Sequence, residues 1–191
     1  MGKTGKIIKT VALTFLFVVI VMFVLRCCMA ADKSKFSGLE ATDAMKRAWA
    51  DGESEILTCR VEAELAADGY FSAYGFYYNP ESGEVQFAVR WNRSVYRYTD
   101  MPEGHEFVFR LRDEVTGEEW PAAVIGTDRM SVYSYRKLVV EGVHADDASQ
   151  LTAVMELRDG FESVQVLKHA EQVFVPYKPK KSFLAEAAGT P

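Results

Sequence analysis

Cysteine is scarce in this chain. Among 191 residues there are three, Cys27, Cys28 and Cys59. The first two follow a long apolar run and Arg26, so Cys59 is the only cysteine in the part that can form a folded domain. One cysteine cannot form an internal disulfide, and we therefore expect packing to stabilise the domain. Two interpretations of Cys27 and Cys28 stay open: small apolar residues that extend the run, or sites of acylation or of an intermolecular bridge.

Short motifs of metal, nucleotide and hydrolase sites are also missing. The three histidines, His105, His144 and His169, have no H-x-H, H-E-x-x-H or Cys-x-x-Cys companion. There is no G-x-S-x-G motif and no glycine-rich phosphate loop. We therefore expect no catalytic residue, no cofactor and no metal ion.

One acidic stretch offers oxygen ligands of the kind that calcium prefers. Glu141, His144, Asp146 and Asp147 fall within seven residues. They lack the D-x-[DN]-x-[DN]-G spacing of a calcium loop, so a solvated acidic loop is the favoured interpretation.

Basic residues are outnumbered in most of the chain. After residue 30 there are 18 Lys and Arg against 27 Asp and Glu, a net charge of −9. A domain with this balance repels phosphate backbones, so we expect it to be soluble and not to bind nucleic acid.

Charge is absent from the sixteen residues between Lys9 and Arg26. With Ile7 and Ile8 added, residues 7–25 (Ile7 through Leu25) form a 19-residue segment that carries one lysine. A helix of this length spans about 28 Å, close to the hydrocarbon thickness of a bilayer of about 30 Å. The sequence predicts an uncleaved membrane anchor in residues 1–30, which would bind the lipid bilayer.

A cleavable signal peptide is the alternative, because Cys28-Met29-Ala30 resembles a cleavage site and would release a secreted protein near Ala30. The length of the apolar run and Arg26 before that site favour the anchor. Lysines precede the uncharged run 10–25 at positions 3, 6 and 9, and Arg26, Lys33 and Lys35 follow it. From this slight bias we expect a cytoplasmic N-terminus and an extracytoplasmic C-terminal domain.

Residues 31–53 are expected to form a juxtamembrane linker and a short stalk helix. Ser37 and Glu40 have capping-box spacing, and Ala44, Met45 and Ala48 recur at helical spacing. Residues 179–191 are polar and small, and we expect a flexible tail.

Residues 54–178 change to an alternation with period two. Val85, Phe87, Val89 and Trp91 alternate with polar residues after the turn at 79–83, which predicts a hairpin with the apolar set facing a core. The other expected strands cover 56–65, 70–78, 106–112, 118–125, 131–140, 151–157, 163–169 and 173–175. Many short strands without a second long helix predict an all-β, antiparallel, immunoglobulin-like β-sandwich, although the cysteine pair of antibody domains is missing.

A row of arginines is the candidate binding patch. If the apolar residues of strands 84–91 and 106–112 face inward, the arginines between them face outward. The candidates are Arg90, Arg93, Arg97, Arg110 and Arg112. Guanidinium groups on one sheet would suit a carboxylate- or phosphate-bearing partner. The alternative is that these arginines pair with cross-strand acids such as Glu84, Glu106 or Glu118 and only solvate the surface.

These observations favour a membrane-tethered, non-catalytic binding or accessory module of the cell envelope or surface. Two other classes stay open. One is an extracytoplasmic hydrolase whose carboxylates are distant in sequence, for example Glu62, Glu64, Asp100 or Glu106. The other is a structural subunit of a membrane complex.

The first prediction concerns the anchor. We expect protein extracted from membranes to retain residues 7–25, because the apolar run is long and Arg26 disfavours cleavage. Mass spectrometry of the N-terminal peptide measures this. A mature N-terminus at Ala31 in the soluble fraction would contradict it.

Overall fold

A computed structural model describes the chain. It describes residues 3–50, 55–59, 63–64, 71–92, 105–129, 133–159, 162–167 and 174–178. The chain divides into two compact units, Met1–Lys35 and Phe36–Pro191. The C-terminal unit therefore includes residues 36–50, which we had expected to lie outside the β domain.

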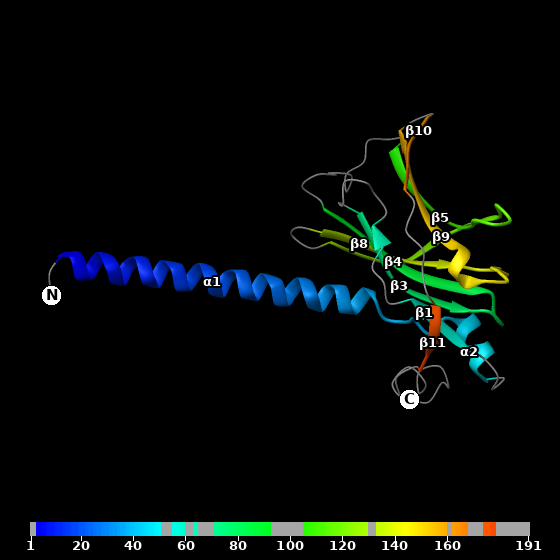
Figure 1. Cartoon of the computed structure of the whole chain (residues 1–191), viewed down its shortest axis with the longest axis horizontal. Helices are drawn as coiled ribbons and strands as arrows, with labels where there is room; N and C mark the ends of the chain where they lie inside the picture. Colours follow the sequence, from blue (N-terminus) through cyan, green and yellow to red (C-terminus); the bar gives the residue numbers. More distant parts are fainter. Residues whose placement is uncertain are drawn as a thin grey trace. The chain divides into compact units, whose positions relative to one another are not determined.

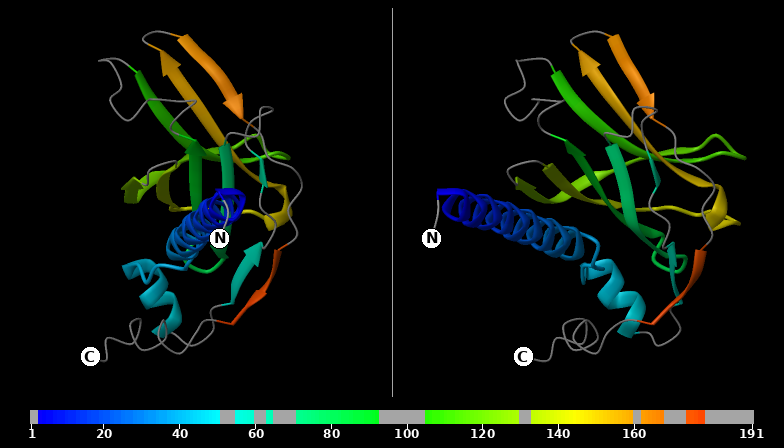
Figure 2. Two further views of the ribbon diagram at one scale, coloured as in Figure 1. Left: turned by 90° about the vertical axis from the view of Figure 1, so that its left-hand side faces the viewer. Right: turned by 60° about the vertical axis from the view of Figure 1, so that its left-hand side comes forward.

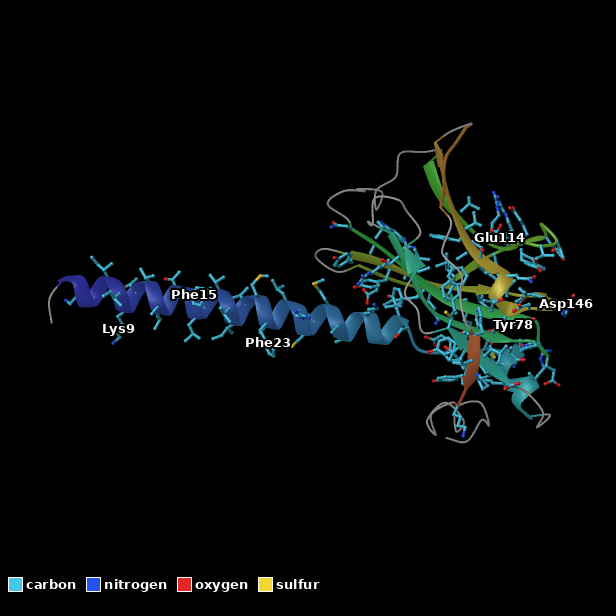
Figure 3. All side chains as sticks on the ribbon, viewed as in Figure 1. Lys9, Phe15, Phe23, Tyr78, Glu114 and Asp146 are labelled. Atoms are coloured by element: carbon cyan, nitrogen blue, oxygen red, sulfur yellow. The ribbon has the colours of Figure 1, made fainter. Side chains whose placement is uncertain are left out.

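The N-terminal unit is helical. Helix α1 (Lys3–Phe36) contains Gly5–Ala31, the one helix among the described residues that is long and apolar enough to cross a membrane. Its apolar side chains are exposed, as Phe15 and Phe23 illustrate in Figure 3. The hydroxyls of Thr10 and Thr14 donate to carbonyls one turn earlier, at 3.0 Å each. The apolar surface and the satisfied hydroxyls both suit a hydrocarbon environment.

Helix α1 extends beyond the predicted segment. Residues 31–36 were expected to be a linker but continue the helix to Phe36, since they contain no glycine or proline. The stalk helix begins later than expected. Helix α2 spans Asp43–Ala50, and its N-terminus is capped by Thr42, whose Oγ1 accepts from the amide of Met45 at 3.3 Å, rather than by Ser37.

The C-terminal unit contains two antiparallel sheets (Figures 1 and 2). The larger sheet has the order β11-β1-β3-β4-β8-β7, with β2 paired to β3, and the smaller sheet has the order β10-β9-β5-β6. The strands are β1 (Ile56–Cys59), β2 (Ala63–Glu64), β3 (Phe71–Asn79), β4 (Glu84–Asn92), β5 (His105–Asp113), β6 (Glu119–Pro121), β7 (Ala123–Arg129), β8 (Tyr133–Val140), β9 (Leu151–Asp159), β10 (Glu162–Leu167) and β11 (Phe174–Tyr177). A short 3-10 helix, η2 (Ala148–Gln150), precedes β9.

Two segments that were each expected to be one strand contain two. The segment 56–65 contains β1 and β2, which both pair with β3. The segment 118–125 contains all of β6 and the start of β7, which belong to different sheets. The chain crosses between the sheets at Ala122, whose amide donates to the carbonyl of Phe109 at 2.9 Å. Pro121 precedes this crossing and has no amide hydrogen for a sheet ladder, so the strand can change partners there.

The main core lies between the sheets. It contains the predicted inward residues of β4 and side chains from the smaller sheet, including Phe109, Leu111 and Ala153. On β3 and β4, Phe76 stacks on Phe87 with ring centroids 4.9 Å apart. The hairpin and its apolar face are therefore confirmed.

The opposite face of the larger sheet is also buried. The residues of β4 that alternate with its core residues, Glu84, Gln86 and Ala88, were expected to face outward, and each is 0% exposed. We call residues Phe36–Thr42 the strap. Phe36 and α2 contribute to two further apolar clusters on this face, one with Tyr135 and one with Tyr77. The alternation predicted the side of the sheet correctly, but the strap and α2 cover that side.

A β-bulge lets the strap approach the sheet closely. The pairing of β3 with β4 shifts register between Tyr74 and Tyr77, and Gly75 within this bulge has φ +63°. A Cβ atom at Gly75 would lie 2.9 Å from both the Cα and the carbonyl oxygen of Ser37. Only glycine fits this position without moving the strap.

The second prediction uses this glycine. Gly75→Ala should lower the free energy of unfolding by about 2 kcal/mol or more, because a left-handed residue and a displaced strap are both unfavourable. Gly117→Ala is the matched control, since Gly117 has φ +74° and no atom within 4 Å of an added Cβ. The control should lose only about 1 kcal/mol. Denaturant titration of the full chain in detergent measures both, and equal losses would contradict a tight strap contact.

Candidate functional site

Three buried side chains of the larger sheet hold the main chain of the strap. We call Tyr77 on β3, Gln86 on β4 and Lys137 on β8 the cradle. Lys137 Nζ donates to the carbonyl oxygens of Phe36 at 3.3 Å and Gly38 at 2.6 Å. The Tyr77 hydroxyl donates to the carbonyl oxygen of Ser37 at 2.8 Å. Three successive strap carbonyls are thus bound by side chains from two strands.

Gln86 makes a two-way contact with the strap. Its Oε1 accepts from the amide of Glu40, and its Nε2 donates to the carbonyl of the same residue, both at 2.9 Å. This pairing uses the donor and the acceptor of one peptide residue, as a neighbouring β-strand would. The cradle therefore recognises backbone rather than particular side chains.

Lys137 is a buried cation. Its side chain is 2% exposed, and Nζ lies 5.5 Å from the centroid of the Tyr77 ring. Burial lowers the pKa of Lys137 to about 8, while the negative charges of Glu40 and Glu84 act in the opposite direction. The strap carbonyls supply polar partners for this ammonium group.

Glu84 joins the end of the strap to the sheet. Its carboxylate accepts from the Thr42 hydroxyl at 2.6 and 2.8 Å and from Gln86 Nε2 at 2.6 Å. Burial raises the pKa of Glu84, although the bonds from Gln86 and Thr42 act to lower it. Burial likewise raises the pKa of Tyr77 to about 12, with a further contribution from Tyr177.

Phe36, the first residue of the strap, belongs to an aromatic cluster on the larger sheet. The Phe36 ring stacks on Tyr135 with centroids 5.4 Å apart and packs with Tyr74 and Ala88. Gly126 on β7 lies beside the same ring, since an added Cβ would be 3.7 Å from Phe36 Cε1. The cradle, the aromatic cluster and Gly75 together fix the end of helix α1 and the turn that follows it on the larger sheet.

The arginine candidates lie elsewhere, and the structure does not bring them onto one sheet. Arg110 and Arg112 lie on β5 of the smaller sheet, while Arg90 lies on β4 of the larger sheet. A single arginine face was expected because both strands alternate similarly, but alternation cannot say which strands share a sheet. Arg93 and Arg97 lie outside the described residues.

Arg110 and Arg112 converge on one acidic residue. Arg110 Nη1 lies 3.2 Å from Glu119 Oε2, and Arg112 donates to Glu119 Oε1 through Nε at 2.7 Å and also through Nη2. The bonds from Arg112, together with the charges of both arginines, hold the pKa of Glu119 below its usual range. The acid is Glu119 on β6 rather than the candidates named from sequence. Arg90 has its guanidinium carbon 5.2 Å from the centroid of the Tyr133 ring.

The other sequence candidates are dispersed. Within the described ranges, no group of three or more His, Cys, Asp or Glu side chains is placed to hold a metal ion. In the acidic stretch, Asp147 caps η2 by accepting from the amide of Ser149 at 2.9 Å. Glu64 belongs to the larger sheet and Glu106 to the smaller one. Glu62, Asp100 and His169 fall outside the described part of the chain.

Sequence reasoning missed the cradle. Lys137 and Gln86 were assigned to strands, but nothing marked them as partners of residues 36–40. One usable signal was present: Glu84 and Gln86 stand in a strand next to β3, which is rich in aromatic residues on both faces. A strand between such neighbours has covered faces, so its polar residues need internal partners.

Comparison with known proteins adds no relative: no protein-family model, no curated protein and no solved structure matches the chain.

The third prediction concerns Lys137. Its folded-state pKa of about 8 lies below its ordinary value of 10.5, so between these values the unfolded chain binds more protons than the folded chain. The free energy of unfolding should therefore rise with pH from about 8 to 10, by about 2 kcal/mol in total. Lys137→Met should remove this rise, whereas Lys178→Met, at an exposed position, should retain it. Denaturant titrations of the full chain at pH 8, 9 and 10 measure the slope, and a wild-type slope in Lys137→Met would contradict the assignment.

Proposed function

We propose that this protein is a single-pass membrane protein whose C-terminal domain binds a partner as an accessory module of the cell envelope or surface, without catalysis. The observation that carries this proposal is the direct passage from the apolar helix α1 into the strap, which is part of the folded domain. A domain built onto the end of its own anchor suits display at a membrane. We propose a cytoplasmic N-terminus and an extracytoplasmic domain.

The roles of the ionisable side chains support binding rather than chemistry. Lys137 and Glu84 hold the strap, and Arg110 and Arg112 share Glu119. Groups held this way maintain the fold and surface, whereas a general acid or base must reach a substrate. Cleavage near Ala30 would leave the strap and both sheets intact, so the binding proposal holds for a secreted form too.

We also propose an immunoglobulin-like architecture for the domain. Two antiparallel sheets with a shared core, and a chain that passes from one sheet to the other, support it. The cysteine pair of antibody domains is absent, and Cys59 lies in the core alone.

The arginine pair is the surface that we propose for an anionic partner. Arg110 and Arg112 are about one quarter exposed, with side-chain values of 24% and 25%. Both guanidinium groups lie at this surface beside the carboxylate of Glu119, and guanidinium groups bind carboxylates and phosphates bidentately. The turn after β5 places Val115 nearby, and its side chain is 70% exposed.

Photo-crosslinking in native membranes tests the proposal. A photoreactive residue is placed at Val115, at Val124 on the exposed part of β7, or at Val18 on α1. We expect a discrete adduct from Val115, lost on replacing Arg110 and Arg112 by Ser and retained in the matched control Lys178→Ser. The double variant should still fold, because partly exposed ion pairs contribute at most about 1 kcal/mol.

The other outcomes distinguish the alternatives. Adducts from Val18 alone would identify a structural subunit held through its helix. An adduct at Val115 that survives the double replacement would show that the two arginines do not bind the partner and only solvate the surface. No adduct from any of the three positions would contradict a binding role.

A further inference from the structure

We propose that β7, at one edge of the larger sheet, binds an extended segment of a partner protein as an added antiparallel strand. The arginine pair then binds acidic side chains at the C-terminal end of that segment. The inference rests on the proposed binding function and names the chemistry of the partner: a strand with apolar residues at alternate positions that ends in carboxylates.

The strand β7 is an open edge among the described strands. It ends the strand order of the larger sheet, and the neighbour with which it pairs is β8. Its residues Val124 and Ile125 are 49% and 43% exposed, so both are accessible to a partner. A sheet edge carries main-chain N–H and C=O groups that can pair with a further strand.

The other three edges of the described sheets are less suited to strand addition. β6 has three residues and contains Pro121, and β11 has four and contains Pro176. Proline lacks the amide hydrogen that a ladder requires. β10 pairs irregularly with β9, and its longest regular stretch is residues 165–167. By contrast, β7 has seven residues and contains neither proline nor lysine, the residues that commonly protect an edge.

A bulge divides β7 into two parts. Its register with β8 shifts between Val124 and Gly126, which leaves residues 126–129 as the regular stretch. The backbone of the ligand would pair with this stretch, and a ligand side chain would contact Val124 and Ile125 beside it. Antiparallel pairing is the more stable kind per residue, so we expect the added strand to run antiparallel to β7.

The arginine pair lies beyond the start of β7. Pro121 is opposite Arg110 in the pairing of β5 with β6, and it lies three positions before Val124. Three extended residues span at most about 11 Å, so a ligand of about eight residues can reach from residues 126–129 to the arginines. A strand antiparallel to β7 ends at this side. Its C-terminal carboxylates would lie beside guanidinium groups that already bind the carboxylate of Glu119.

Peptide binding to the full chain in lipid nanodiscs tests the proposal. The probe is a dye-labelled peptide, SVTVTVEE, and its fluorescence anisotropy measures binding. The reference peptide, EESVTVTV, has the same composition with the acidic residues first. We expect SVTVTVEE to bind at least tenfold more tightly, and replacement of Arg110 and Arg112 by Ser should remove this preference. Equal binding of the two peptides to the wild type would overturn the proposal.

Methylation of the probe backbone distinguishes strand pairing from side-chain adhesion. A paired edge strand directs alternate residues toward its neighbour for hydrogen bonding. One modified probe is N-methylated at its second and fourth residues, and the other at its third and fifth. We expect one of the two to lose at least tenfold in affinity and the other to bind within threefold of the unmodified probe. Equal affinities of the two modified probes would contradict strand addition.

A substitution on β7 locates the site. Ile125→Lys puts a charge on the edge, as natural edge strands do to prevent pairing. Val175→Lys on β11 is the matched control, because Val175 is an edge-strand residue that is 39% exposed. We expect Ile125→Lys to weaken probe binding at least tenfold and Val175→Lys to leave it unchanged. Equal effects would overturn the proposal. If Ile125→Lys lowers the denaturation midpoint, the methylated probes decide the case with the unaltered protein.

The two proposals fail on different outcomes. Self-association of the full chain without probe binding would assign the β7 edge to a second copy and would overturn strand addition. A crosslink from Val115 that depends on the arginine pair, with no adduct from Val124 and no probe binding, would reject strand addition and leave the binding function in place. No adduct from either position and none from Val18 would contradict the binding function itself.

Discussion

The hydrogen bonds from Lys137 to the strap carbonyls determine how the larger sheet is covered. One face of this sheet packs on the smaller sheet, which leaves the other face with glutamate, glutamine and lysine side chains among aromatic ones. Charged groups cannot be buried against an apolar layer without a large desolvation cost. The strap carbonyls are polar partners for Lys137, and the Phe36 ring stacks on Tyr135 in the aromatic cluster. One short segment therefore supplies both the hydrogen-bond partners of Lys137 and the ring that packs on Tyr135.

The bulge in β3 is the local feature that makes this cover possible. It inserts Gly75 between Tyr74 and Tyr77, so both tyrosines stay on the outer face three residues apart. The missing side chain at Gly75 brings the strap backbone against the sheet, within reach of the Tyr77 hydroxyl. Without the bulge, regular alternation would turn one of the two tyrosines into the main core.

The polar contact between the strap and the sheet contributes differently to stability than the apolar core does. The main core buries apolar side chains, which gain stability by leaving water in proportion to their area. The cradle contributes less net stability, because the buried charge of Lys137 loses hydration. Its hydrogen bonds mainly fix the position of the strap. The inner face of the sheet therefore stabilises the fold through apolar burial, and the outer face fixes the position of the strap through hydrogen bonds.

The sequence by itself determined the features that depend on local pattern. The apolar run predicted a helix fit for a bilayer, the change to period two predicted antiparallel strands, and the turn at 79–83 predicted the hairpin of β3 and β4. Side-chain direction along β4 was also predictable, since it follows from alternation alone.

Tertiary structure decided what covers each face and which strands share a sheet. The strap contacts join residues 40 to 101 positions apart, and no local pattern encodes such pairs. The same limit explains why Arg90 was grouped with Arg110 and Arg112, and why 118–125 was expected to be one strand. Periodicity states on which side of a strand a residue lies, whereas burial depends on a partner that only the folded chain brings there.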